Sequence, residues 1–360
     1  MRMKIVAGLG SIDEYERFVE AGADEFFCGY VPYSWSKKYG TVLPLNRREV
    51  LCYNVQIGSF GELEILAAMI RKYKKPVHLT FNSLYYIPEQ YPEIAEIIRR
   101  CMTLGFQSYI IADPALIVYL REDNIECDIH ISGETGEINS QMMAAFAKFR
   151  PKRLIFHRKN TFEDMESVIR SSRNQNQQKV LPVTSEFEAF VLNELCQFTG
   201  AFCNSLHCDE MGYLCRVPYI LGRREIGKTE TKLNLVSGRI KDKCEDEENY
   251  AWYVDGASGE KISSVEKETD EMENSSCDDS GYLCGETGCG LCALYQLRKA
   301  GITHLKLVGR GNYVDYMEND IRSLKHALNI LDQSQSEADF ITKMKSQLFS
   351  DGCSKNCYYR

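Results

Sequence analysis

The sequence predicts an α/β fold of the (β/α)8 TIM-barrel-like type, with room for distortion and with a Cys-rich insertion before the last strand. Over the first 190 residues, short apolar, β-branched runs alternate with amphipathic stretches, which is typical of repeated βα units. Eight units in about 250 residues, with the insertion set aside, favour a closed barrel over an open sheet. No GxGxxG turn follows the first run, so a dinucleotide-binding fold is not supported.

Eight apolar runs are expected to form the strands, and helices are expected to follow them. The runs are Met3–Ala7, Glu25–Gly29, Pro76–Asn82, Gln107–Ala112, Asp128–Ser132, Arg153–His157, Val180–Ser185 and Thr303–Val308. Three pairs of residues are typical of helix N-caps, because a carboxylate follows a hydroxyl residue by three positions. These pairs are Ser11 with Glu14, Ser59 with Glu62, and Thr161 with Asp164.

Composition divides the chain into four segments. Between Arg239 and Ser280 the sequence becomes acidic and polar without an apolar period, which indicates a solvated insertion. Trp252–Tyr253 and Asp255-Gly256 predict one hairpin inside it, and an amphipathic helix is expected from Arg310 to about Asp332. The segments are 1–235 (units one to seven and the first Cys cluster), 236–282 (acidic insertion), 283–335 (second Cys cluster and last unit) and 336–360 (polar tail).

The overall composition is that of a globular protein able to bury a core: 360 residues, of which 44% are hydrophobic and 26% charged. A formal charge of −8 gives no global field that attracts phosphate backbones, so contact with RNA needs a local basic patch. No stretch approaches the ~20 apolar residues that cross a bilayer, and no export signal is visible at the N-terminus. We therefore expect a soluble, cytoplasmic protein without a membrane partner.

The 15 cysteines indicate metal or redox chemistry, because a chain without an export signal does not use them as a disulfide framework. Cys28, Cys52, Cys101 and Cys127 are scattered, and we expect them to be core thiols. The other eleven lie from Cys196 onward.

Polar residues that end apolar runs are candidates for an active site, because strand C-termini face the active site in such barrels. Arg158 and Arg310 suggest an anionic ligand, since a guanidinium grips a carboxylate or phosphate with two hydrogen bonds. Asp113 precedes Pro114 and could instead cap a helix, and Asn82 could be a turn residue. The catalytic candidates are Asn82, Asp113, Glu186 and Glu188, and the substrate-binding candidates are His130, Ser132, Arg158 and Arg310.

Two groups of cysteines are candidates for metal ligands. Their irregular spacing favours a 4Fe–4S cluster over structural zinc, which more often shows paired short knuckles, although zinc remains the alternative. The first group is Cys196, Cys203, Cys208 and Cys215, and the second is Cys284, Cys289 and Cys292.

The stretch Glu188-x-Phe190-x-x-Asn193-Glu194-Leu195-Cys196, with Cys203 seven residues later, resembles the signature of the U32 peptidase family. The segments VHLTFNSL, YIIADPALI, IHISGETGEINS and ITHLKLVGRG resemble segments of that family in the same order. The resemblance covers roughly residues 1 to 330.

The resemblance implies a ligand set for a 4Fe–4S cluster of the kind found in members that hydroxylate without oxygen. Cys196, Cys203 and Cys292 fall on three of the ligand positions, and Cys215 falls beside the fourth. Cys208 is the alternative third ligand, because the family usually has a cysteine where this chain has Met211.

The function implied is an oxygen-independent hydroxylase, or a subunit of one, acting on RNA, a quinone precursor or another small aromatic acceptor. The cluster is expected to relay electrons or act as a Lewis acid, Arg158 and Arg310 to hold an anionic oxygen donor, and Glu186 or Glu188 to handle protons. A second U32-family subunit is an expected partner. Two alternatives stay open: a collagenase-like peptidase, although no HExxH or GxSxG motif is present, and a non-catalytic iron–sulfur scaffold.

Overall fold

The computed structural model describes residues 2–40, 42–47, 55–136, 138–173, 186–196, 220–225, 250–255, 282–350 and 352–359. The chain divides into two units, one formed by Met1–Gly212 with Gly281–Arg360 and the other by Tyr213–Ser280. The first unit carries the barrel.

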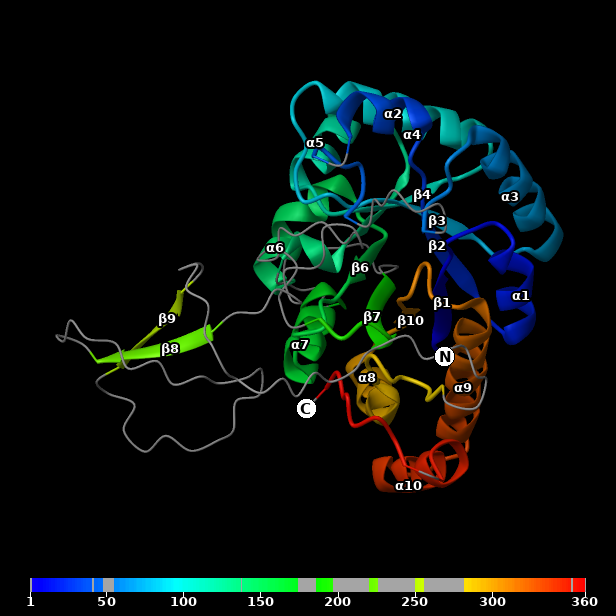
Figure 1. The fold of residues 1–360 in the computed structure, drawn as a ribbon, viewed down its shortest axis with the longest axis vertical. Coiled ribbons are helices and arrows are strands. Elements are labelled where there is room, and N and C mark those ends of the chain that lie inside the picture. Colours follow the sequence, from blue (N-terminus) through cyan, green and yellow to red (C-terminus); the bar gives the residue numbers. More distant parts are fainter. Residues whose placement is uncertain are drawn as a thin grey trace, which may run out of the picture. The chain divides into compact units, whose positions relative to one another are not determined.

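Eight parallel strands close into a barrel in the order β1-β10-β7-β6-β5-β4-β3-β2, which confirms the predicted (β/α)8 fold (Figure 1). The strand after the insertion, β10, pairs with both β1 and β7 and so closes the ring. The expected run Val180–Ser185 lies outside the described residues, and β7 begins directly after it. The strands are β1 Lys4–Gly8, β2 Glu25–Gly29, β3 Val77–Phe81, β4 Ser108–Ile111, β5 Asp128–Ile131, β6 Arg153–Ile155, β7 Glu186–Leu192 and β10 His304–Leu307.

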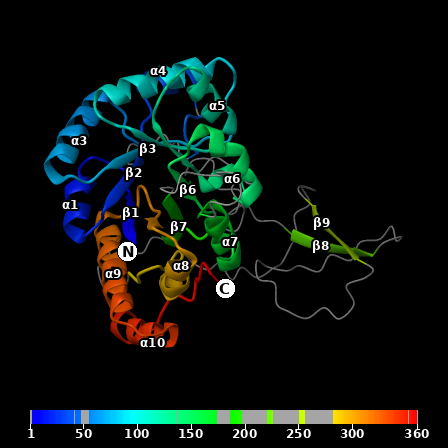
Figure 2. The ribbon, with the colours of Figure 1, turned by 180° about the vertical axis from the view of Figure 1, so that it is seen from behind.

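Helices surround the barrel on its outer side, as both views show (Figures 1 and 2). No described helix is both long enough and apolar enough to span a membrane. The α-helices are α1 Glu14–Ala21, α2 Tyr33–Tyr39, α3 Phe60–Tyr73, α4 Gln90–Thr103, α5 Pro114–Glu122, α6 Ser140–Phe146, α7 Phe162–Arg173, α8 Leu294–Ala300, α9 Val314–Asp332 and α10 Glu337–Leu348. Short 3-10 turns are η1 Gly133–Thr135, η2 Ala147–Phe149 and η5 Leu291–Ala293.

Two of the three predicted helix caps are confirmed. Ser59 and Glu62 form a full capping box, in which each side chain accepts a hydrogen bond from the other residue's backbone N–H. Thr161 and Asp164 do the same, with distances of 3.0 and 3.1 Å. The third, Ser11 with Glu14, is wrong because Asp13 is the N-cap and the Glu14 carboxylate turns back to accept from the Gly10 N–H at 2.7 Å.

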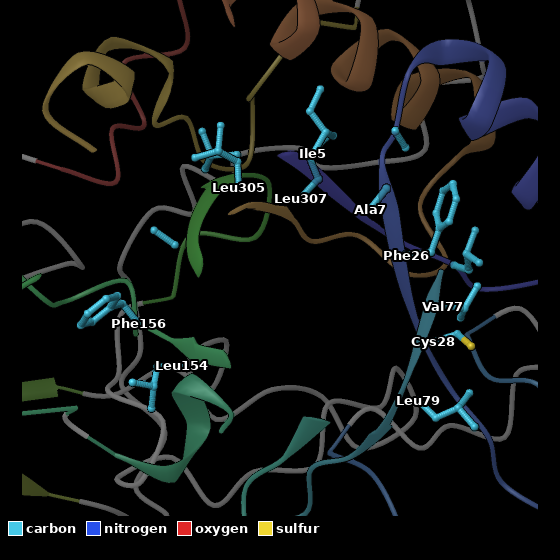
Figure 3. Packing of buried hydrophobic residues seen from close by; sticks show 14 of the residues in the cluster. Ile5, Ala7, Phe26, Cys28, Val77, Leu79, Leu154, Phe156, Leu305 and Leu307 are labelled. Carbon is cyan, nitrogen blue, oxygen red and sulfur yellow. The ribbon is translucent and has the colours of Figure 1, made fainter. Parts of the chain in front are cut away.

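Alternating side chains of the strands build two layers of core. The outward-facing set packs beneath the helices, and Figure 3 shows Ile5, Phe26 and Leu154 among its members. The inward-facing set forms a small apolar cluster inside the barrel. Its buried residues are Val6, Phe27, Ile110, Ile155 and Phe190, with Tyr358 from the C-terminal segment.

The expected core thiols Cys28, Cys101 and Cys127 are buried, and burial raises the pKa of each to about 12, about 12 and about 11. This confirms the expectation for these three. Cys52 lies outside the described residues.

The second unit and the C-terminal segment differ from the predicted hairpin and the predicted polar tail. In the second unit, β9 Tyr250–Asp255 contains the Trp252–Tyr253 pair and runs antiparallel to β8 Ile220–Glu225, a strand that precedes the acidic segment. The segment 336–360, expected to be a polar tail, contains α10, whose Phe340 and Met344 are buried. The prediction of a polar tail is therefore wrong for α10, because a segment of mostly polar composition still has one apolar helix face.

Candidate functional site

The C-terminal end of the barrel, called here the barrel mouth, holds the two arginines that the sequence singled out. Arg158 follows β6, is 7% exposed, and lies with its guanidinium carbon 4.0 Å from the ring centre of Phe190. Arg310 follows β10, is 5% exposed, and donates from Nη1 to Thr80 Oγ1 at 3.4 Å. Both cations are thus held against the interior apolar cluster rather than in bulk water.

A third buried arginine, Arg47, lies at the same mouth and was missed by sequence reasoning. Its Nη1 is 3.2 Å from Glu134 Oε2 beyond β5, and its backbone N–H donates to Asn82 Oδ1 beyond β3. Arg47 belongs to the connection between α2 and α3, and the short apolar run before it, Val42–Leu45, contains Pro44 and forms no strand. The sequence therefore held no strand-end signal that could have found it.

Several buried donors at the mouth lack an acceptor among the described residues. His157 Nδ1 accepts from the Lys159 N–H at 3.2 Å, so the proton resides on Nε2, which has no partner. Burial lowers the pKa of His157 to about 4, and the ring is neutral. Asn46 Nδ2 and Arg158 Nε are likewise buried and unpartnered. Buried donors without acceptors are unfavourable, and their grouping indicates a place for an acceptor-rich ligand.

His130 lies deeper, on the inward side of β5, where it is fully buried. Its ring packs against the ring of His78 at 4.6 Å, and neither ring nitrogen has a hydrogen-bond partner in the described structure. Burial, then the charge of Arg153, holds the pKa of His130 well below its usual range. It is therefore a neutral imidazole, whose two ring nitrogens can donate one hydrogen bond and accept another inside the barrel.

The expectation that Glu186 and Glu188 lie at the mouth is wrong. Both belong to the first half of β7, at the opposite end of the strand, where EFEAFVL alternates inward glutamates with outward apolar residues. Arg153 donates to Glu186 Oε2 and Glu188 Oε2, and Lys306 Nζ donates to Glu188 Oε1 at 2.9 Å. Although burial raises it, Lys306 and Arg153 together lower the pKa of Glu188 to about 2. Glu188 is therefore ionised at neutral pH and held in ion pairs with Arg153 and Lys306.

Three other candidates have structural roles at the strand ends. Asp113 Oδ1 accepts from the Ala115 N–H at 2.8 Å as N-cap of α5, and Asp113 Oδ2 accepts from the Tyr91 hydroxyl. Ser132 Oγ accepts from the Glu134 N–H as cap of η1. Asn82 orders the Arg47 loop through the bond described above. Catalytic or binding roles for these residues stay predictions.

The predicted cluster ligands are only partly described. Cys203, Cys215 and the alternative Cys208 lie outside the described residues. Cys196, half-buried, follows β7 and is within electrostatic range of Arg158. Cys292 lines a cavity together with three other cysteines. Within the described part of the chain, no three His, Cys, Asp or Glu side chains are already grouped as a metal site.

Comparison with known proteins gives a family match. The model of peptidase family U32 matches residues 10–360. Among solved structures, the U32 peptidase Mk0906 is 11% identical over 52% of this chain and 68% of its own, with a TM-score of 0.39. Dihydrodipicolinate synthase from Bacillus clausii is 9% identical over 95% of this chain and 78% of its own, with a TM-score of 0.43. No curated protein matches the chain significantly.

Proposed function

Because the chain belongs to peptidase family U32, we propose that it is an iron–sulfur enzyme that binds an anionic ligand at the barrel mouth and hydroxylates an acceptor without oxygen. The observation that carries the proposal is the surplus of buried donors at the mouth. Arg47, Arg158 and Arg310 bring three positive charges there, while Glu134 and Glu194 bring two negative ones. An anionic oxygen donor or substrate satisfies both the charge and the unpartnered donors.

The chemistry of the cysteines supports an iron–sulfur cluster, since soft thiolates are the usual ligands of such clusters. We propose Cys196, Cys203 and Cys215 as ligands, with Cys208 and Cys292 as candidates to complete the set. When bound, a cluster supplies electron transfer or Lewis acidity. The proximity of Cys196 to Arg158 supports a cluster beside the anion site.

This chain's own residues then have separable tasks. Arg158 and Arg310 orient the anion, and the Nε2–H of His157 donates a hydrogen bond to it. His130 is a neutral imidazole inside the barrel that can exchange hydrogen bonds with the acceptor, whereas Glu188 is already paired to Lys306. The apolar cluster around Phe190 excludes water beneath the site.

The decisive experiment combines metal analysis with a deletion strain. Protein purified without oxygen should contain about four irons per chain and show broad visible absorbance from thiolate-to-iron charge transfer. Profiling of RNA modifications and quinones should reveal a missing hydroxyl group in the deletion strain. Wild-type and the surface control Arg150→Ala should restore it, whereas Cys196→Ala and Arg158→Ala should not.

Two outcomes would contradict the proposal. Hydrolysis of gelatin by the iron-free protein, at the rate of the iron-loaded protein, would favour the peptidase alternative. Full restoration by Arg158→Ala, with iron retained, would favour a non-catalytic scaffold.

A further inference from the structure

We infer that Cys289, Cys292, Cys353 and Cys357 form a second thiolate site, which binds one zinc ion and fastens the C-terminal segment to the barrel. Both preceding sections leave three of these cysteines without a role. All four line one cavity of about 40 Å³, and all four are free thiols. The inference does not rest on the proposed hydroxylation, but it removes Cys292 from the candidates for the cluster.

Backbone pairing holds the two cysteine segments side by side. The Cys289 N–H donates to the Asn356 carbonyl at 2.8 Å, and the Tyr358 N–H donates to the Cys289 carbonyl at 2.9 Å. These bonds make Cys289 and Cys357 partners in a parallel bridge. In Figure 1 the red segment after α10 turns back toward α8, the helix that follows Cys292. The thiols therefore meet through tertiary structure and not through sequence proximity.

A turn precedes the first pair of cysteines, and another lies between the members of the second pair. Gly285 has φ +70°, and a Cβ there would lie 2.7 Å from the Cβ of Cys289. Lys355 has φ +60° at the centre of the turn between Cys353 and Cys357. The resulting C-x2-C and C-x3-C pairs have the spacing of structural zinc knuckles, unlike the irregular spacing from Cys196 to Cys215.

The cavity's surroundings suit a negatively charged tetrathiolate centre. Cys289 is within electrostatic range of Cys292, Cys353 and Cys357, and the Leu291 N–H hydrogen-bonds to it. Lys345 also lines the cavity and acts electrostatically on Cys292, which offsets part of the charge of four thiolates. No three of the thiols converge as they stand, so binding requires side-chain rotation between rotamers.

The site has two consequences for the barrel. Tyr358 directly follows Cys357 and lies in the interior cluster beside Arg158, while the Tyr359 hydroxyl donates to the Phe190 carbonyl at 2.7 Å. A metal bound by the four cysteines therefore holds Tyr358 and Tyr359 in place against the interior of the barrel. Cys292 is then committed to this site. The first group of four cysteines, Cys196 to Cys215, remains as a complete set for the cluster.

The test measures zinc and iron in the full chain. Wild-type protein should contain one zinc per chain, and the double variant Cys353→Ser/Cys357→Ser should lose zinc at least about tenfold while keeping its iron. The matched control Cys101→Ala, a buried thiol on α4, should keep both metals. The double variant Cys203→Ser/Cys208→Ser should lose iron and keep zinc. Zinc content therefore tests this inference, and iron content tests the proposed cluster.

A second measurement uses the wild-type chain and so does not depend on a variant that folds. Replacing zinc by Co²⁺ should give the intense visible absorption of a tetrahedral thiolate centre, and a chelator should abolish it and speed proteolysis after α10. Unchanged zinc in the double variant, loss of iron in place of zinc, or a disulfide between these cysteines in the purified protein would each overturn the inference.

Discussion

Arg153 Nη1 donates a hydrogen bond to Glu188 Oε2 at 2.8 Å inside the barrel, where the two side chains are 2% and 0% exposed. The same guanidinium also donates to Glu25 and Glu186, each at 2.6 Å. One arginine thus links three carboxylates from two strands. It fixes the end of the barrel opposite the mouth, and its removal tests how much stability such a network carries.

Arg153→Leu should lower the free energy of unfolding by about 3–5 kcal/mol, because it leaves buried carboxylates without their shared partner. Urea unfolding at neutral pH measures the change. Arg150→Leu is the control, since its partner Glu126 and Arg150 itself are both more than 60% exposed, and its effect should stay within about 1 kcal/mol. Equal losses in the two variants would show that the network is not a stabilising feature.

The stability should depend on pH through Glu14. Burial, partly opposed by hydrogen bonds from the Gly10 and Ser11 N–H groups, raises the pKa of Glu14 to about 7. The folded state then holds the proton more tightly than the unfolded chain, whose pKa is about 4.3. This contribution is complete below about pH 4.3 and disappears as the pH rises through about 7.

Glu14→Gln should therefore reduce the decline in unfolding free energy between about pH 5 and pH 7, which in the wild type amounts to as much as about 3 kcal/mol. Urea titrations at several pH values measure the slope. A wild-type slope unchanged by the substitution would assign the pH dependence to other groups.

Gly29 on β2 should not tolerate a side chain. An added Cβ would lie 1.5 Å from Gln56 Oε1 and 2.9 Å from Arg310 Nη1, so Gly29→Ala must displace both groups. We expect a loss of about 1–3 kcal/mol together with weaker anion binding. Gly61→Ala, on helix α3, is the control, because a Cβ there would meet only Ser59 Oγ, at 4.0 Å. That variant should be neutral or more stable by up to about 1 kcal/mol.

Arg158→Lys and Arg310→Lys should keep the fold and the iron content but weaken anion binding, because lysine lacks the planar fork of guanidinium. Inorganic phosphate serves as the probe, since a ligand that binds the folded state raises the melting temperature with concentration. The phosphate-induced shift should shrink in both variants and persist in Arg150→Lys. A full shift in both would remove the anion site.

Local chemistry explains which features could be predicted from the sequence. Seven of the eight expected strands match observed ones, since alternation of apolar residues is a property of neighbouring positions. The Ser59–Glu62 capping box was predicted for the same reason, because its two residues are only three positions apart. Glu186 and Glu188 were assigned to the wrong end of their strand, because nothing in a single segment reveals ion-pair partners such as Arg153 and Lys306 that come from other strands.

The sequence by itself determined the barrel, its strand count and the presence of arginines suited to an anion. Hydrophobic periodicity and residue type are properties of single segments, so they can be recognised without the fold. Only the tertiary structure decided which distant groups meet. It brought Arg47 to Glu134 at the mouth, and it brought Cys353 and Cys357 to the cavity that Cys289 lines. The physical reason is that barrel closure and the return of the C-terminal segment after α10 depend on the packing of the whole chain, which no local pattern encodes.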